Sequence, residues 1–514
     1  MAQWTGVRLT GDDLTLADVW DVAVDGAPVE LSDSAREKMR AARRLVERAA
    51  YGLDEHTYGI NTGFGRFVSQ RIPRELAEEL QLRLLRSHAC GVGDPYPDEL
   101  VRAAMLLRAN ALAKGHSGAR IETVELMLAC LARGLLPHVP ARGSVGASGD
   151  LAPLAHLALP LVGEGEAWVE SERLPGADAL AAVGLEPIRL EAKEGLSLVN
   201  GTQFMAAAGA LGAVRAQRLA KAADIACALS VEALQGSRMS FLARIHELRP
   251  LPGQQASAAN LLRLLEGSAI IEAHRWCDRV QDAYSLRCAP QVHGASRDLL
   301  AYAEGTVAVE LNAATDNPLV LVEDELLVSN GNFHGQSLAF ALDSLAMAVS
   351  ELASISERRL ERLVNPQLSD GLPAFLTTDG GLNSGFMIPQ YVAASLVSEN
   401  KVLSHPASVD SIPTSAGQED HVSMGNAAAL KGWQALANAE RVVAIELLAG
   451  AQAVEFLAPL EPGIGGRAAR EFVRTLSPRL RDDRPLAPDI EEVAAVLRDG
   501  SLVLAVEAEV GELA

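Results

Sequence analysis

The chain has 514 residues and a formal net charge of −21; 49% of its residues are apolar and only 4% are aromatic. This acidic excess disfavours nucleic acid or an anionic membrane surface as a partner. The length exceeds the roughly 250–300 residues at which single cores usually stop growing, which predicts two or three core units unless long helices run through all of them. Because Ala, Leu and Val must build the core, closely packed helices are favoured.

Composition also limits the cellular setting and the cofactors. The first residues lack the charged start and apolar run of a signal peptide. The most apolar stretches contain acids such as Glu446 and Glu455, so we expect buried helices rather than membrane spans. No His or Cys spacing typical of a metal site is present, and no metal is expected. The cysteines form no Cys-x-x-Cys pair, which predicts reduced thiols in a cytoplasmic protein; they are Cys90, Cys130, Cys227, Cys277 and Cys288.

The N-terminal region mixes short strands and turns with helices. A helix is predicted after Ser32-Asp33, which can cap its start. Tyr58-Gly-Ile-Asn-Thr-Gly-Phe-Gly65 is too glycine-rich for a regular element. It is either a packed turn or a mobile lid that carries a catalytic phenol. The following helix is predicted to end at Gly91, which places His88 where a helix end favours a cation.

The stretch Gly143-Ser-Val-Gly-Ala-Ser-Gly-Asp150 holds three glycines in seven residues and predicts a loop. A second interpretation is that Ala147-Ser148-Gly149 undergoes a cyclisation of its own backbone. Because Gly149 has no Cβ, its amide nitrogen can approach the carbonyl carbon of Ala147. Ring closure with loss of water gives an imidazolone. Loss of the Ser148 hydroxyl as a second water leaves an exocyclic methylene, a carbon electrophile made from the chain itself.

Residues 190 to 460 predict four or five long helices with breaks, one of them near 289–297. Asn200-Gly201 is a turn dipeptide before an Ala-rich helix at roughly 204–235. For Asn200 alone, turn geometry or a helix cap would suffice. Residues after 460 are charged, rich in proline and then helical, and they say nothing about chemistry.

A polar group precedes Pro290, which is predicted to end a helix. Gln281, Tyr284 and Cys288 have i, i+3, i+7 spacing, with Arg287 at the edge of the same face. A solvated face with one aromatic ring is one interpretation. The other is a substrate site, because the planar guanidinium of arginine can bond both oxygens of a carboxylate.

Two further polar stretches follow. A strand hairpin is predicted from Leu319 to Val328, and the turn Asn332-Phe-His-Gly335 comes after it. The segment from Ser404 to Met424 has no regular periodicity, yet it holds two histidines, three acids and a glutamine. A loop this polar in an apolar chain is either exposed or part of a site.

Six separated motifs between about residues 50 and 460 resemble the aromatic amino acid ammonia-lyases. The central one is Gly146-Ala-Ser-Gly-Asp-Leu-Ala-Pro-Leu-Ala-His156. This resemblance implies that Ala147, Ser148 and Gly149 form the family's cofactor, 4-methylidene-imidazol-5-one (MIO), autocatalytically and without a metal or nucleotide. It also implies a set of catalytic residues, namely Tyr58 as the base, Ser148, Tyr284 and Glu419. The substrate-binding residues it implies are His88, Asn200, Gln281, Arg287, Phe333 and Gln418.

The resemblance extends to substrate. Gln418-Glu419-Asp420-His421-Val422 is similar to the histidine-specific branch of the family. Ser87-His88 is also similar to that branch, but tyrosine lyases carry a histidine at the same place, so His88 alone does not separate the two substrates. The expected reaction is non-oxidative deamination of L-histidine to trans-urocanate and ammonia, the first step of histidine degradation. An MIO-dependent aminomutase, a lyase for tyrosine or phenylalanine, and a non-catalytic helical scaffold are the alternatives. Gln336 and Gly417 depart from the usual Glu and Asn of the family, and His293 is assigned no role.

The resemblance implies a mainly α fold of the fumarase/aspartase-like architecture. We expect residues 1–200 to form a mixed α/β region with the lid loop and the MIO segment, 201–460 a central bundle of long helices, and 461–514 a helical tail. Fumarase chemistry itself is not expected, because its serine-rich signature loop is absent. The family is tetrameric, so we expect a homotetramer with shared active sites, whose residue clusters need not come from one chain.

Overall fold

The structure is a computed structural model that describes residues 6–51, 59–60, 62–146, 148–276 and 278–514. Tyr58, Ala147 and Cys277 therefore lie outside the described residues. The chain forms two compact units, each assembled from non-consecutive segments. Unit 1 comprises residues 1–211, 303–342 and 406–430, and unit 2 comprises residues 212–302, 343–405 and 431–514. The expected division into the consecutive regions 1–200, 201–460 and 461–514 stays a prediction.

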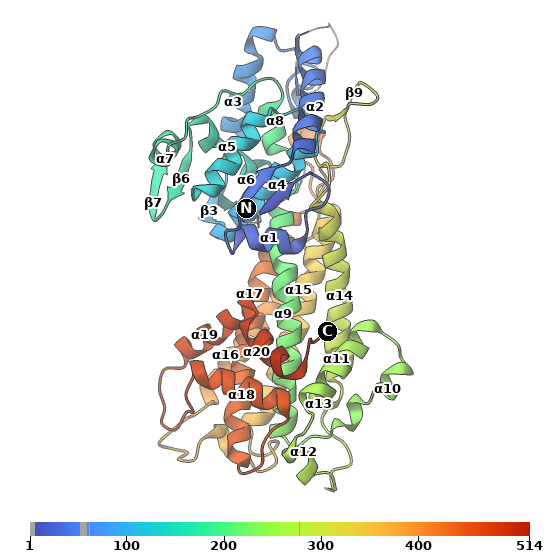
Figure 1. The fold of residues 1–514 in the computed structure, drawn as a ribbon, viewed down its shortest axis with the longest axis vertical. Coiled ribbons are helices and arrows are strands. Elements are labelled where there is room, and N and C mark those ends of the chain that lie inside the picture. The colour runs from blue at the N-terminus through green and yellow to red at the C-terminus, as the bar shows by residue number, and fades with distance from the viewer. Residues whose placement is uncertain (1–5, 52–58, 61, 147, 277) are drawn as a thin grey trace, which may run out of the picture. The chain divides into compact units, whose positions relative to one another are not determined.

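Unit 1 is the mixed α/β part (Figure 1). Its helices are α1 (Leu16–Ala23), α2 (Asp33–Tyr51), α3 (Ala77–His88), α4 (Asp98–Ala113), α5 (Ile121–Ala132), α6 (Leu151–Ala158), α7 (Gly176–Ala182) and α8 (Glu194–Val199). Its 3₁₀ turns are η1 (Gly65–Phe67), η2 (Arg74–Leu76), η3 (Leu159–Val162) and η6 (Ser415–Gly417). The predicted cap of α2 is confirmed, because the Ser32 hydroxyl accepts a bond of 3.0 Å from the Ala35 amide.

In the described part of unit 1, the strands are short and pair in four small sheets. They are β1 (Val7–Leu9), β2 (Val29–Leu31), β3 (Val92–Pro95), β4 (Leu135–Pro137), β5 (Pro140–Arg142), β6 (Glu166–Val169), β7 (Glu172–Pro175), β8 (Leu319–Leu321) and β9 (Leu326–Val328). β1 and β2 are parallel, whereas β3–β5, β4–β6–β7 and β8–β9 are antiparallel. The predicted hairpin from Leu319 to Val328 is thus confirmed.

Four long helices have residues in both units: α9 (Gln203–Ala233), α14 (Ala289–Glu310), α15 (Gln336–Val364) and α17 (Gly425–Val454). Alanine dominates the buried positions of α9, as expected for close helix packing. A mainly α fold with long helices was predicted and is confirmed (Figure 1). Among the described residues, α15 alone has the length and apolar composition of a membrane span, and 72% of that apolar window is buried.

Shorter helices complete unit 2: α10 (Ala243–Glu247), α11 (Pro252–Leu264), α12 (Ala269–Ala273), α13 (Tyr284–Arg287), α16 (Met387–Leu403), α18 (Ile464–Leu476), α19 (Ala487–Asp499) and α20 (Ser501–Val510). The 3₁₀ turns here are η4 (Arg238–Phe241), η5 (Ala374–Leu376) and η7 (Glu455–Leu457). Its interior holds ion pairs, including Arg359 with Glu446 and Arg215 with Glu440, all of them almost fully buried.

One predicted boundary is wrong. Pro290 does not end a helix; it lies in the first turn of α14, so the break expected near 289–297 is helical. Proline is tolerated there because the amides of a first turn have no partner within the helix. Gln281 precedes α13, and Cys288 lies between α13 and α14. The helical face expected from the i, i+3, i+7 spacing is therefore absent, although Arg287 still contacts both Gln281 and Tyr284.

Candidate active site

The glycine-rich loop joins β5 to α6 in unit 1, and its backbone takes conformations that favour glycine. Gly146 and Gly149 have φ of +72° and +74°, and Ser148 has a φ of +50°. A Cβ on Gly149 would lie only 2.0 Å from the carbonyl oxygen of Gly201. Glycine, which the predicted ring closure would require, is thus also the only residue type that fits the packing at this position.

The loop is fixed on two sides within unit 1. The Met424 amide donates to the carbonyl of Val145 at 2.9 Å, and the Ser423 hydroxyl donates to the carbonyl of Gly146 at 3.3 Å. On the other side, the Asp150 amide donates to the carbonyl of Gly201 at 2.6 Å. Val145, Gly146 and Asp150 are therefore held by two segments that are distant from the loop in sequence.

Asp150, directly after the triad, is fully buried. Its carboxylate accepts hydrogen bonds from the Ser144 hydroxyl at 2.9 Å and the Met205 amide at 3.0 Å. Burial raises the pKa of Asp150 to about 6, although these hydrogen bonds oppose the rise. The side chain fastens both ends of the loop to the start of α9.

Glu419 is an acid from a distant part of the sequence whose side chain reaches Ser148. Its Oε1 is 3.5 Å from the hydroxyl of Ser148, and its Oε2 accepts a hydrogen bond of 2.8 Å from the hydroxyl of Thr414. The Thr414 amide also donates to the Glu419 carbonyl at 2.7 Å, which closes the small turn that presents the acid. Half-buried Glu419 thus has one oxygen committed to the protein and one directed to Ser148.

His88, the last residue of α3, belongs to the same cluster. Its Nδ1 lies 2.9 Å from the carbonyl oxygen of Leu84, which can only accept, so this nitrogen carries the proton. Burial lowers the pKa of His88, while the charge of Glu419 opposes that shift. The neutral ring keeps its lone pair on Nε2.

Asn200 is buried beside the loop. Its side-chain nitrogen Nδ2 donates to the backbone carbonyl of Asn317 at 3.1 Å, and its backbone carbonyl oxygen accepts from Arg108 at 2.9 Å. Its side-chain oxygen Oδ1 is buried and has no hydrogen-bond partner among the described residues. Such a buried orphan acceptor needs an explanation, for example a group still to be bound.

Two further predicted residues, Phe333 and Gln418, also belong to unit 1. Phe333 is half-buried in the turn between β9 and α15, and Gln418 is exposed. Gln336, at the departure from the family pattern, donates to the carbonyl of Ser408 at 3.1 Å. Its Oε1 is a second buried acceptor without a partner in the described part of the chain.

The described neighbours of Tyr58 pack closely against the site. A Cβ on Gly59 would lie 2.2 Å from the Leu196 side chain of α8. A Cβ on Gly65 would lie 2.4 Å from the hydroxyl of Ser415 in the 414–419 turn. The segment that follows Tyr58 therefore contacts the turn that presents Glu419.

The predicted residues Gln281, Tyr284 and Arg287 lie in unit 2, where the Arg287 side chain contacts the other two. The guanidinium of Arg287 donates to the backbone oxygen of Asp282 and to the side-chain oxygen of Gln281, both at 2.9 Å. It also lies 4.7 Å from the centre of the Tyr284 ring, and this ring is 71% exposed. Gln281, Tyr284 and Arg287 thus form one group on the surface.

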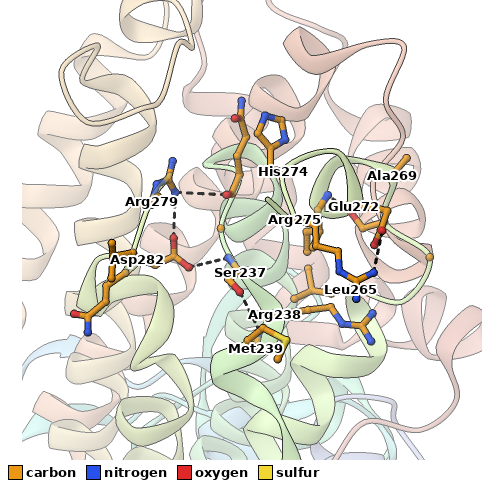
Figure 2. A pocket seen from close by; sticks show the side chains of 17 residues that line it. Ser237, Arg238, Met239, Leu265, Ala269, Glu272, His274, Arg275, Arg279 and Asp282 are labelled. Atoms are coloured by element: carbon orange, nitrogen blue, oxygen red, sulfur yellow. Dashed lines mark hydrogen bonds and ion pairs between the residues drawn. The ribbon is translucent and has the colours of Figure 1, made fainter. Parts of the chain in front are cut away.

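A polar pocket of about 700 Å³ adjoins this group in unit 2, lined by parts of residues 235–239, 265–275 and 279–282. Figure 2 shows Arg279 and Asp282 pointing toward one another across its edge. Their side chains are 3.1 Å apart, and Asp282 also accepts from the Ser237 amide at 2.7 Å. No sequence pattern indicated this pocket, because its wall comes from three segments that are separate in sequence.

Sequence reasoning also missed supporting residues. Thr414, which holds Glu419, gave no signal among the other polar residues of its loop. Arg108, which holds Asn200, could have been noticed as a charge within the apolar stretch of α4, where it is almost fully buried. Among the described residues, no group of three or more His, Cys, Asp or Glu side chains could hold a metal ion.

Comparison with known proteins identifies the family of the chain. The chain belongs to the aromatic amino acid lyase family, whose model matches residues 14–477. It is a carbon–nitrogen lyase by this membership and by its relatives. It is 59% identical to a histidine ammonia-lyase of Gloeobacter violaceus over 98% of both chains.

Solved structures show the same fold. A histidine ammonia-lyase of Trypanosoma cruzi is 46% identical, with a TM-score of 0.91 over 99% of this chain and 96% of that one. A tyrosine aminomutase of Streptomyces globisporus is 38% identical, with a TM-score of 0.94 over 99% of this chain and 100% of that one. The fold thus supports more than one reaction, and the site residues must decide between them.

Proposed function

We propose that this chain converts L-histidine to trans-urocanate and ammonia, as the first step of histidine degradation, using an MIO group formed from Ala147, Ser148 and Gly149. The observation that carries the proposal is the contact of 3.5 Å between Ser148 and Glu419. This contact places Ser148, which would become the electrophile, beside Glu419, the acid suited to bind an imidazole ring. Curated histidine ammonia-lyases that are 50–59% identical over nearly the whole chain support the same substrate.

The residues present fit the MIO group. Gly149 has the bare Cα and positive φ that cyclisation needs, and Ser148 is half-buried. Asn200 offers a buried, unpartnered oxygen beside the loop, suited to accept a hydrogen bond from a substrate amine held there. When formed, MIO supplies an electrophilic carbon for the substrate amine, which makes the nitrogen a better leaving group.

The other roles belong to side chains of the protein. Arg287, held by Gln281, would bind the substrate carboxylate with its planar fork. Glu419 and neutral His88 together offer the imidazole an acceptor for each N–H it presents. A phenyl ring has no such donor, and binding it would leave the Glu419 oxygen that faces the site without a partner.

Tyr58 is proposed as the base that takes the β-proton, although it lies outside the described residues. A phenol ordinarily has a pKa of about 10. It can accept a proton near neutral pH only if the site stabilises the phenolate, for instance by the positive ends of nearby helices.

We also propose a cytoplasmic homotetramer in which neighbouring subunits complete each active site. Support comes from the division of the predicted residues: His88, Ser148, Asn200, Phe333 and Glu419 belong to unit 1, whereas the Arg287 group belongs to unit 2. The strong exposure of Tyr284 is consistent with a group that acts on another subunit.

The test is to incubate the purified protein with L-histidine and to follow urocanate by absorbance and ammonia by a coupled assay. We expect stoichiometric release of both, with far slower turnover of L-tyrosine and L-phenylalanine. The aminomutase of similar fold makes one other result informative. A β-amino acid formed without urocanate would replace lyase by aminomutase activity.

A further inference from the structure

His156 lies on α6, about two turns after the MIO triad, and the site described above gives it no role. Its Nε2 is 3.0 Å from the backbone nitrogen of Gly91, which donates the hydrogen bond. Burial, together with the neighbouring His138, lowers the pKa of half-buried His156. The ring is therefore neutral at pH 7, with the proton on Nδ1 and the accepting lone pair on Nε2.

Gly91 ends the turn that carries His88. α3 ends at His88, and Ala89 has φ −77° and ψ 65°, the angles of an inverse γ-turn. The Cys90 amide closes this turn by donating to the carbonyl of His88 at 2.8 Å. Few soft dihedrals remain between His88 and Gly91, so the position of the Gly91 amide constrains the backbone of His88.

The same turn packs against the first residues of the glycine-rich loop, which contains the MIO triad. A Cβ on Gly143 would lie 3.2 Å from the Cα of Gly91, and one on Gly91 would lie 3.3 Å from both the Arg142 carbonyl oxygen and the His156 ring. Val92 pairs with Arg142 between β3 and β5. Main-chain contacts thus hold the turn against β5, and the His156 side chain connects it to α6.

We propose that His156 is a positioning residue that fixes the orientation of His88 and, through it, the binding of the substrate ring. The inference rests on the proposed function, in which His88 contacts the imidazole of L-histidine. His156 connects the helix that starts at the MIO loop with the turn that bears the ring-binding histidine. It therefore sets the distance between the reacting carbon and the ring, and it acts on binding more than on chemistry.

The kinetic test compares three substitutions. His156→Leu and His156→Asn place no acceptor at the position of Nε2, whereas His156→Gln places its amide oxygen there. We expect KM for L-histidine to rise about five- to tenfold in the Leu and Asn variants, the effect of one lost hydrogen bond. We expect kcat to change less than KM, and the Gln variant to stay within about twofold of the wild type. The Asn variant also serves if the Leu variant does not fold.

A double-mutant comparison separates positioning from general damage. If His156 acts through His88, adding His156→Asn to a His88→Ala protein should raise KM no further. Equal KM increases in both backgrounds would overturn the proposal, as would Leu, Asn and Gln variants that all behave alike. His116→Leu is the matched control, because it removes another bond from a half-buried histidine to a backbone group, 2.8 Å from the Val320 carbonyl. It should leave KM unchanged.

Hydrogen exchange gives a readout that does not require turnover. The amides of residues 89–92 should exchange faster in the Asn variant than in the wild type, and at the wild-type rate in the Gln variant. Unchanged exchange in the Asn variant would overturn the proposal. Absence of histidine turnover in the wild type would refute the proposed function instead, and exchange would still show whether His156 holds this turn.

Discussion

At the scale of single residues, the proposed function depends on the carboxylate of Glu419, which would link the electrophile formed at Ser148 to the substrate ring. Thr414 holds one of its oxygens, and the other lies 3.5 Å from Ser148. Both Glu419 and Ser148 were predicted from short motifs, because their chemistry depends on residue type. Thr414 could not be predicted, because its role depends only on where the chain folds back.

Replacing this acid tests its role. Glu419→Gln keeps the shape of the side chain but removes the charge that strengthens its contact with imidazole. We expect kcat/KM for L-histidine to fall about 10- to 100-fold, which corresponds to roughly 1.5–3 kcal/mol. Initial rates of urocanate formation measure the effect. Asp420→Asn, at the exposed neighbouring position, is the control and should change the rate less than twofold. An equal loss in both variants would contradict a specific role for Glu419.

At the scale of elements, the sequence predicted the features that depend only on residues close together in the chain. The cap at Ser32 and the Ala-rich helix α9 were predictable because caps and propensities act within a few residues. Pro290 was misassigned, because proline both ends helices and begins them, and tertiary packing selects between the two. The approach of Gly149 to Gly201 joins segments about 50 residues apart and gives no signal in the sequence.

The close packing of Gly149 in the glycine-rich loop gives a further testable prediction. Gly149→Ala would force a Cβ to within 2.0 Å of the Gly201 carbonyl oxygen at a φ of +74°. We expect loss of activity and a clear fall in Tm. Gly134→Ala is the matched control, with a φ of +70° and nothing within 4 Å of the added Cβ. It should cost only about 1–2 kcal/mol for the left-handed backbone and keep activity. Equal Tm changes in the two variants would contradict the close-packing argument.

At the scale of the whole molecule, burial of acids makes stability depend on pH. Burial raises the pKa of Glu232 in α9 to about 7, above its ordinary value of 4.5. The folded state therefore holds this proton more tightly than the unfolded state. The resulting stability is fully present below about pH 4.5 and is lost as the pH rises through about 7.

Glu232→Gln should remove this dependence. The amide stays neutral at every pH, so its Tm should fall less than that of the wild type between pH 5 and pH 8. The difference in unfolding free energy at pH 8 is up to about 3 kcal/mol in favour of the variant. Thermal unfolding at both pH values measures it. Parallel Tm curves for the two proteins would show that Glu232 does not titrate in this range.

The long-range arrangement of the chain was the least predictable feature. Composition predicted a helical protein, and motifs predicted which residues carry chemistry, but the two units consist of interleaved segments. No local pattern shows that residues 303–342 and 406–430 join the N-terminal region. Contacts between residues far apart in sequence determine that assembly, and they are visible only in the folded chain.

The central claim is that the chain makes its own electrophile at Ser148, and intact mass tests it most directly. The wild-type protein should be lighter than its encoded sequence by two water molecules. Ser148→Ala, which cannot lose the hydroxyl, should lack the second loss and should not turn over L-histidine. A wild-type mass equal to that of the encoded sequence, in a preparation that forms urocanate, would contradict the account.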